Sequence, residues 1–155
     1  MGNIDFSAGA VLTAAQLNDI GDWKSWTPTW SNVTINSATV NAKYMQVGET
    51  VYYQLYYLGA SDTVYTTGGM RFRIPVASNT DLVYQPSGFG WARPNKAGTI
   101  YTILGLEISE TIVMYAQKNT LTYIFNDVVD SSTPTTWQTT GSLADLYIQG
   151  WYKST

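Results

Sequence analysis

Residues 40–57 read VNAKYMQVGETVYYQLYY, which is two runs of alternating side chains on either side of Gly48-Glu49. A glycine at the first central position of a two-residue turn is typical of the type II′ turn that closes β-hairpins. Such a turn fixes how the two strands pair, because the residues that flank it must face each other. We therefore predict four opposed pairs: Val47 with Thr50, Tyr44 with Tyr53, Ala42 with Leu55, and Val40 with Tyr57.

The predicted hairpin has two unlike faces. The mostly apolar face carries Val40, Ala42, Tyr44, Gln46, Val51, Tyr53, Leu55 and Tyr57. The mixed face carries Asn41, Lys43, Met45, Tyr52, Gln54 and Tyr56. A slip of one residue would expose the apolar face, so the register is strongly specified. Tyr52 and Tyr56 combine an apolar ring with a polar tip and therefore suit either water or a neighbouring subunit, which makes both candidate subunit-interface residues.

The chain from Val33 onward is rich in β-branched and aromatic residues and has no helical period. Pro28 lacks a backbone donor and marks the edge of a sheet. Further strands are predicted at residues 70–76, 82–84, 88–92, 99–108, 111–117, 120–126 and 145–153, with a turn at Lys118-Asn119 and a long loop over residues 127–141. Short strands separated by turn signals predict an all-β fold, an antiparallel jelly-roll-like β-sandwich over residues 24–155.

Residues 1–23 have a different character, and they carry signals for a short helix over residues 13–20. Thr13 and Gln16 form a capping box, and Gly21 is placed to end the helix. A helix of two turns is not stable alone in water, so its apolar side chains must be buried against the chain's own β-domain or against other copies or a larger assembly. These candidate anchor residues are Leu12, Leu17, Ile20 and Trp23.

Composition excludes many functions. The chain has 155 residues, with 8 Lys plus Arg against 11 Asp plus Glu, a net charge of −3, and no Cys or His. It therefore has no disulfide, no thiolate or imidazole catalysis, and no Cys- or His-type metal site. Scattered cations cannot form the basic stripe that nucleic acid requires, and no apolar run is long enough for a membrane span. We predict no cofactor, no metal, no enzymatic activity, no nucleic-acid partner and no membrane insertion.

Paired carboxylates are the remaining source of catalysis. Glu107 and Glu110 are three residues apart, and so are Asp127 and Asp130. A glycosidase needs two carboxyl groups about 5 Å apart or somewhat more. Solvated charges on loops and strand edges are the simpler interpretation, and a polysaccharide depolymerase is the alternative from a different class.

Four polar and aromatic residues suggest a saccharide site. Sugar rings stack on exposed Trp or Tyr, while amide and guanidinium groups bind their hydroxyls. Residues 90–95, which begin in the predicted strand 88–92 and run past it, and the loop residues 136–138 offer such groups. Large rings on loops are harder to explain as core. The candidate residues are Trp91, Arg93, Asn95 and Trp137, with burial in the core as the competing interpretation, because Trp is usually well buried.

Several strings resemble small virion proteins of tailed bacteriophages and the C-terminal domains of their tail and receptor-binding proteins. They are LTAAQLN at residues 12–18, WKSWTPTW at 23–30, YMQVGETV at 44–51, FRIPV at 72–76 and YIQGWY at 147–152. Glu49 stands where the group usually has Lys, and residues 80–142 carry no string of this kind.

The resemblance implies a homotrimeric β-domain on the virion surface. It implies a structural protein on the tail or tail tip that adheres to the host surface, with host cell-wall saccharide as a candidate partner. Residues 1–23 would join other virion proteins. The alternative with the same fold is a capsid decoration or head-fibre protein.

Overall fold

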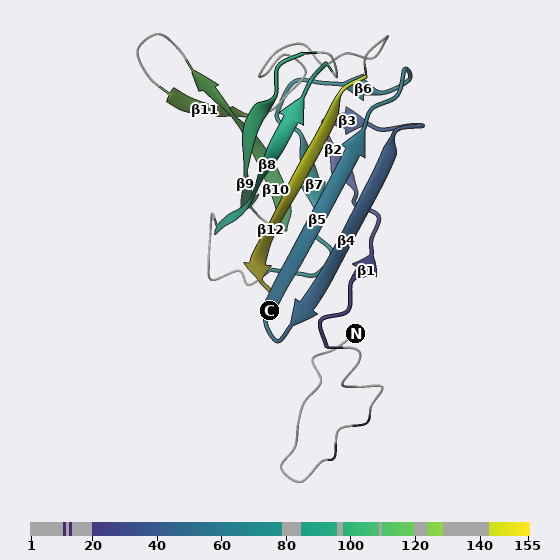
Figure 1. Ribbon diagram of the computed structural model, residues 1–155, viewed down its shortest axis with the longest axis vertical. Coiled ribbons are helices and arrows are strands. Elements are labelled where there is room, and N and C mark those ends of the chain that lie inside the picture. The colour runs from purple at the N-terminus through teal and green to yellow at the C-terminus, as the bar shows by residue number, and fades with distance from the viewer. Residues whose placement is uncertain are drawn as a thin grey trace.

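The computed structural model describes Val11, Thr13 and residues 20–78, 85–95, 98–108, 110–119, 124–128 and 143–155. Of residues 85, 86, 107, 117–119 and 124–128 it describes the backbone only. All regular structure in this part of the chain is β-strand, which confirms the predicted all-β class (Figure 1). The predicted strand at residues 82–84 and most of the predicted helix at residues 13–20 lie outside the described residues.

Ten strands form one antiparallel sheet, in the order β1-β4-β5-β12-β8-β9-β10-β7-β2, with β11 paired to β10 and with β3 and β6 forming a separate pair. The strands are β1 (Lys24–Ser25), β2 (Trp30–Ser31), β3 (Val33–Thr34), β4 (Thr39–Val47), β5 (Thr50–Leu58), β6 (Val64–Tyr65), β7 (Arg71–Arg73), β8 (Gln85–Arg93), β9 (Tyr101–Ile108), β10 (Thr111–Asn119), β11 (Ile124–Val128) and β12 (Asp145–Lys153). The sheet curls like a half-barrel (Figure 1), an arrangement compatible with the predicted sandwich.

The β4–β5 hairpin has the predicted register. All four predicted pairs are present, from Val47 opposite Thr50 to Val40 opposite Tyr57. Gly48 has a φ of 58°, which a type II′ turn requires at its first central position. The predicted apolar face points inward, where Ala42 and the alternate β5 residues Val51, Tyr53, Leu55 and Tyr57 are buried.

One short segment connects the two distant edges of the sheet. β1 pairs with β4 at one edge, and β2, only four residues later, pairs with β7 at the other. Between them, the Trp26 N–H donates to the Ala42 carbonyl at 3.1 Å, and the Thr29 carbonyl accepts from the Arg73 N–H at 2.8 Å. Pro28, predicted to mark the edge of a sheet, lies outside the strands, in the connection between β1 and β2. Residues 24–31, called the clasp below, therefore hold the curl closed.

The two clasp tryptophans fill the space inside the curl. The Trp26 ring lies 6.3 Å from Tyr53 and 6.0 Å from Phe72, measured between ring centroids. The Trp30 ring lies 5.4 Å from Tyr57 and 5.7 Å from Phe72. Tyr53 and Tyr57 come from β5 and Phe72 from β7, so the tryptophans join opposite halves of the sheet. Aromatic pairs at these separations add to the stabilisation that area burial gives.

β12 runs between β5 and β8 with the predicted bounds, residues 145–153. Its Gly150 lies opposite Gly88 of β8, and a Cβ on Gly150 would overlap the Ser87 carbonyl oxygen. The Tyr53 ring reaches this point from β5, and its hydroxyl lies over Gly88. Glycines at this crossing let the backbones approach closely and leave room for the tyrosine.

Two local predictions are wrong. The predicted turn at Lys118-Asn119 lies inside β10, where these residues pair with Phe125 and Ile124 of β11. The predicted loop over residues 127–141 begins too early, because β11 extends to Val128. β10 is longer than β7, so β10 offers β11 an unpaired edge beyond β7, and this tertiary pairing overrides the local turn signal.

The first prediction concerns the clasp. Trp30→Ala should lower the free energy of unfolding by about 3 kcal/mol, because it removes ring contacts with both halves of the curl. Trp23→Ala, at an exposed tryptophan just before the clasp, should cost less than about 1 kcal/mol. Urea unfolding followed by circular dichroism at one protein concentration measures both. Equal losses would contradict the closing role of Trp30.

The second prediction concerns Tyr53, whose buried hydroxyl has no hydrogen-bond partner among the described residues. Burial raises the pKa of Tyr53 well above its usual 10.0, with a smaller contribution from Tyr152. Stability is therefore intact below pH 10 and falls as the pH rises above it, by about 1.4 kcal/mol per pH unit for one such group. Tyr53→Phe should reduce this alkaline loss and raise stability at pH 7 by about 1 kcal/mol.

Tyr57→Phe is the matched control. The Tyr57 and Tyr65 hydroxyls are hydrogen-bonded at 2.7 Å, so removal of the Tyr57 hydroxyl should lower stability at pH 7. Urea unfolding at pH 7, 10 and 11 compares the two variants with the parent chain. A destabilised Tyr53→Phe protein at pH 7 would show that its hydroxyl has a favourable partner.

Candidate functional site

The solvent side of β4, β5, β12, β8 and β9 is one continuous surface, called the outer face below. Strand alternation that buries one set of side chains places the other set there. Several of these are large and apolar: Phe89 is 60% exposed, Trp151 53% and Tyr52 38%. Large apolar side chains clustered on a surface mark an interaction site more often than isolated ones do.

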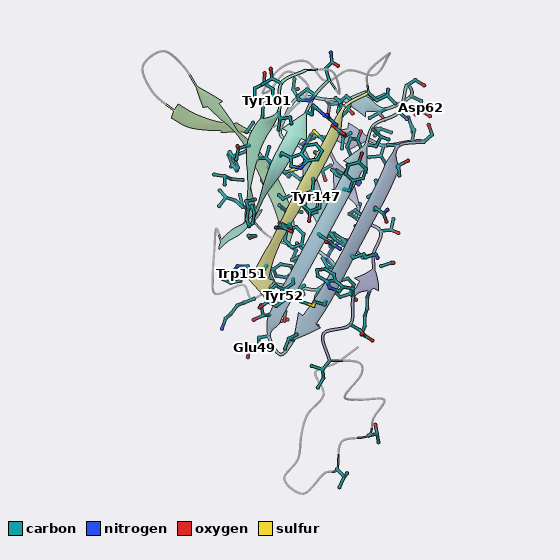
Figure 2. All side chains as sticks on the ribbon, viewed as in Figure 1. Glu49, Tyr52, Asp62, Tyr101, Tyr147 and Trp151 are labelled. Atoms are coloured by element: carbon teal, nitrogen blue, oxygen red, sulfur yellow. The ribbon has the colours of Figure 1, made fainter. Side chains whose placement is uncertain are left out.

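Cross-strand register arranges the outer face in three rows. The first row is Met45, Tyr52 and Trp151. The second row is Lys43, Gln54, Gln149, Phe89 and Leu104. The third row is Asn41, Tyr56, Tyr147, Trp91 and Thr102. Figure 2 shows Tyr52 and Trp151 close together toward one end of the sheet and Tyr147 near its middle.

One predicted saccharide residue, Trp91, and both predicted interface residues, Tyr52 and Tyr56, lie in these rows. Trp91 is on β8 in the third row, where Tyr147 separates it from Tyr56. Asn95 lies two residues beyond β8, and its carbonyl accepts from the Gly98 N–H at 2.7 Å. Trp137, the fourth predicted saccharide residue, lies outside the described residues.

Arg93 is engaged by a buried carboxylate. Its Nε and Nη2 donate to the two Asp145 carboxylate oxygens at 2.8 and 2.6 Å. The Asp145 side chain is 2% exposed and the Arg93 side chain 24%. The hydrogen bond to Asp145 raises the pKa of Arg93, so the guanidinium stays charged. The same guanidinium lies 5.5 Å from the centre of the Trp91 ring. Arg93 therefore joins the buried carboxylate of Asp145 to the ring of Trp91.

The tyrosines of the third row are hydrogen-bond donors. The Tyr147 hydroxyl donates to Gln149 Oε1 at 2.7 Å, which orients that amide and leaves its NH₂ group for another partner. Burial raises the pKa of Tyr56, and the Asp145 carboxylate raises it further, while Arg93 opposes them. Tyr56 is therefore a neutral phenol at physiological pH.

A shallow hollow of about 260 Å³ lies between the second and third rows. Five of its lining residues belong to these rows: Asn41, Lys43, Gln54, Tyr56 and Tyr147. The lining side chains offer amides, hydroxyls, one ammonium group and two aromatic rings, and none is acidic. These groups suit the binding of a hydroxyl-rich ligand, and they provide neither a nucleophile–base pair nor a pair of carboxyl groups.

Within the described ranges, no cluster of acidic side chains has the makings of a metal site, and no helix is long and apolar enough to cross a membrane. Glu110, from the predicted carboxylate pairs, forms an ion pair with Arg73 at 2.8 Å. The side chains of Glu107, Asp127 and Asp130 lie outside the description.

The two candidate anchor residues that the structure describes, Ile20 and Trp23, lie at one end of the strands. Ile20 and Trp23 are both exposed, and Gly21 lies beside Val47 at the β4–β5 turn. The Ser154 N–H donates to the Glu49 carbonyl there, so the last residues reach the same end. Asp62 and Tyr101 lie at the opposite end (Figure 2). Leu12 and Leu17 fall outside the described residues.

Sequence reasoning did not identify Phe89, Tyr147 or Trp151 as site residues. The signal was present in the last strand, where Tyr147, Gln149 and Trp151 alternate with Leu146, Ile148 and Tyr152. The missing information was the neighbour of each strand, which the pairing of β12 with β5 and β8 supplies.

The third prediction concerns the Arg93–Asp145 pair. Arg93→Met should lower the melting temperature, because it leaves a buried carboxylate without its partner. The double variant Arg93→Met/Asp145→Leu should melt above Arg93→Met alone, since it removes both charges. Arg73→Met, at the exposed pair with Glu110, is the matched control and should melt close to the parent chain. Calorimetry gives the order, and a double variant that melts lowest would contradict it.

Comparison with known proteins returns no match, whether with protein-family models, curated proteins or solved structures.

Proposed function

We propose that this chain is a structural protein of a bacteriophage virion, displayed on the tail or tail tip, that adheres to saccharide on the host surface. The outer face carries this proposal. It exposes aromatic rings from β5, β8 and β12 beside the amides of Asn41, Gln54 and Gln149. Rings that stack on sugars and amides that bind hydroxyls are the two elements of carbohydrate recognition, and adhesion needs no catalytic group.

The phage identity derives from the sequence resemblance, and the layout of the domain is consistent with it. Residues 20–24 join the sheet at the end with the β4–β5 turn, while the turn near Asp62 lies at the other end (Figure 2). The nine-residue strands β4, β5 and β12 separate these ends by about 30 Å. An anchor over residues 1–23 would hold one end to other virion proteins and leave the outer face and far end accessible.

We further propose a homotrimer of jelly-roll-like domains, in which the two halves of the curled sheet are the sandwich layers. The first row is the best candidate for the contact between copies. Its three residues, Met45, Tyr52 and Trp151, are large and uncharged, as the core of a subunit interface requires. Tyr56, the other predicted interface residue, lines the hollow and is the better candidate for ligand contact.

The fourth prediction is the adhesion test. The purified full chain should bind saccharides on an array of bacterial surface polysaccharides. Trp91→Ala should weaken that binding at least tenfold, because it removes the ring that extends the third row. Trp23→Ala, exposed but outside the rows, should bind as the parent does. Equal binding by both variants would remove Trp91 from the site, and no binding by the parent chain would refute saccharide adhesion.

The trimer and the location have separate tests. Light scattering on the full chain should give three times 17.2 kDa, and Trp151→Ser should give a smaller mass. A monomeric parent chain would contradict the trimer. Antibody labelling of intact particles should mark the tail or tail tip, whereas label on the head would favour the capsid decoration or head-fibre alternative.

A further inference from the structure

We propose that the hollow between the second and third rows binds the anionic group of a charged saccharide, with Lys43 as the residue that selects it. The inference rests on the proposed saccharide adhesion and adds the chemical class of the ligand. The anionic group is either the carboxylate of a uronic acid or the phosphodiester of a polyol-phosphate polymer, because an ammonium group recognises both as a point charge.

Charge is the first argument. Lys43 is the only charged residue in the three rows. Two other cations of the described residues lie on this side of the sheet, and both have an acidic partner: Arg93 pairs with Asp145 at 2.6 Å and Lys153 with Glu49 at 3.8 Å. No carboxylate of the described residues pairs with Lys43. A protein with a net charge of −3 thus presents an uncompensated cation on its most aromatic surface.

The surroundings of Lys43 supply the second argument. Gln54 lies directly opposite Lys43 on the hairpin. The next pair on the same face, farther from the turn, is Asn41 opposite Tyr56. Two amides and a phenol thus lie around the ammonium group, ready to bind hydroxyls next to the anion. Tyr147 also lines the hollow, and Trp91, its neighbour on β8, extends the aromatic surface beyond the hollow.

The size of the hollow limits the ligand. At about 30 Å³ per water molecule, 260 Å³ holds about nine waters, which is room for one sugar residue. A single ammonium group also lacks the row of cations that a nucleic acid would need. The hollow is open, so the rest of a glycan chain can continue over the third row toward Trp91.

The experiment compares charged and neutral forms of the same saccharide on the full chain. The probes are an oligogalacturonide, its methyl ester, a glycerol-phosphate polymer and a neutral glucan, each titrated by calorimetry at low and at high salt. We expect one of the two anionic probes to bind at least tenfold more tightly than its neutral partner, with weaker binding at high salt. Preference for the first or the second anionic probe identifies the carboxylate or the phosphodiester.

Three variants then assign the preference. Lys43→Gln should reduce binding of the anionic probe about tenfold, to the level of the neutral probe, and Lys43→Arg should retain most of it. Arg71→Gln, at an exposed cation on β7 away from the outer face, should bind as the parent does. Circular dichroism of each variant checks that the fold is intact, which is expected because Lys43 is exposed.

The outcomes separate the two proposals. Neutral saccharides that bind in a Trp91-dependent and Lys43-independent manner would overturn the anion site and leave saccharide adhesion in place. An anionic preference that survives Lys43→Gln would overturn the role of Lys43. Absence of binding to every charged and neutral saccharide, on the array and by titration, would overturn both.

Discussion

The structure depends on the clasp, because a curled sheet of ten strands has two free edges that must be held near each other. β1 and β2 are two residues each, and yet they bind opposite edges, through β4 and β7. Asn32, just beyond β2, adds hydrogen bonds at 2.7 Å to the carbonyls of Gly68 and Gly69 before β7. The segment also limits exposed edge strands, which are a hazard for aggregation. Without it, the rings of Tyr53, Tyr57 and Phe72 would lose the tryptophans that separate them from water.

The closed curl gives every long strand a buried side and a solvent side, and this division creates the site. β5 places Tyr53 and Tyr57 in the core and Tyr52 and Tyr56 on the outer face, so the same residue type serves both purposes by position alone. Of the two inner tyrosines, Tyr53 carries a cost, because its hydroxyl is buried without a hydrogen-bond partner among the described residues. The outer tyrosines keep their hydroxyls available to solvent or ligand.

The sequence predicts local features of the fold, such as a hairpin register or the bounds of a strand. It does not predict features that depend on the order of strands in the sheet. The two-residue turn at Gly48 fixes the hairpin register, and the alternation of side chains in residues 145–153 sets the bounds of β12. Both features were therefore predictable. The rows of the outer face were not, because Tyr56 and Tyr147 are neighbours only through the β5–β12 pairing across 91 residues. Trp91 and Tyr56 were assigned to different roles for the same reason. The turn signal at Lys118-Asn119 failed because β10 found a further partner in β11.

The outer face exposes the large aromatic side chains of Phe89 and Trp151, and their exposure needs an explanation. Full burial of a large apolar side chain is worth about 1.5–3 kcal/mol, so Phe89 and Trp151 would stabilise the fold more in the core than on the surface. Under the proposed function, adhesion and assembly are the two uses that would retain them, and we propose that the rows divide between these uses. The first row has no charge, which suits a contact with another copy. The second and third rows interleave rings with amides and one ammonium group, whose desolvation against an apolar partner would be costly. A polar, hydroxyl-rich ligand satisfies those groups and still covers the rings, and we therefore infer that the two rows serve recognition and the first serves assembly.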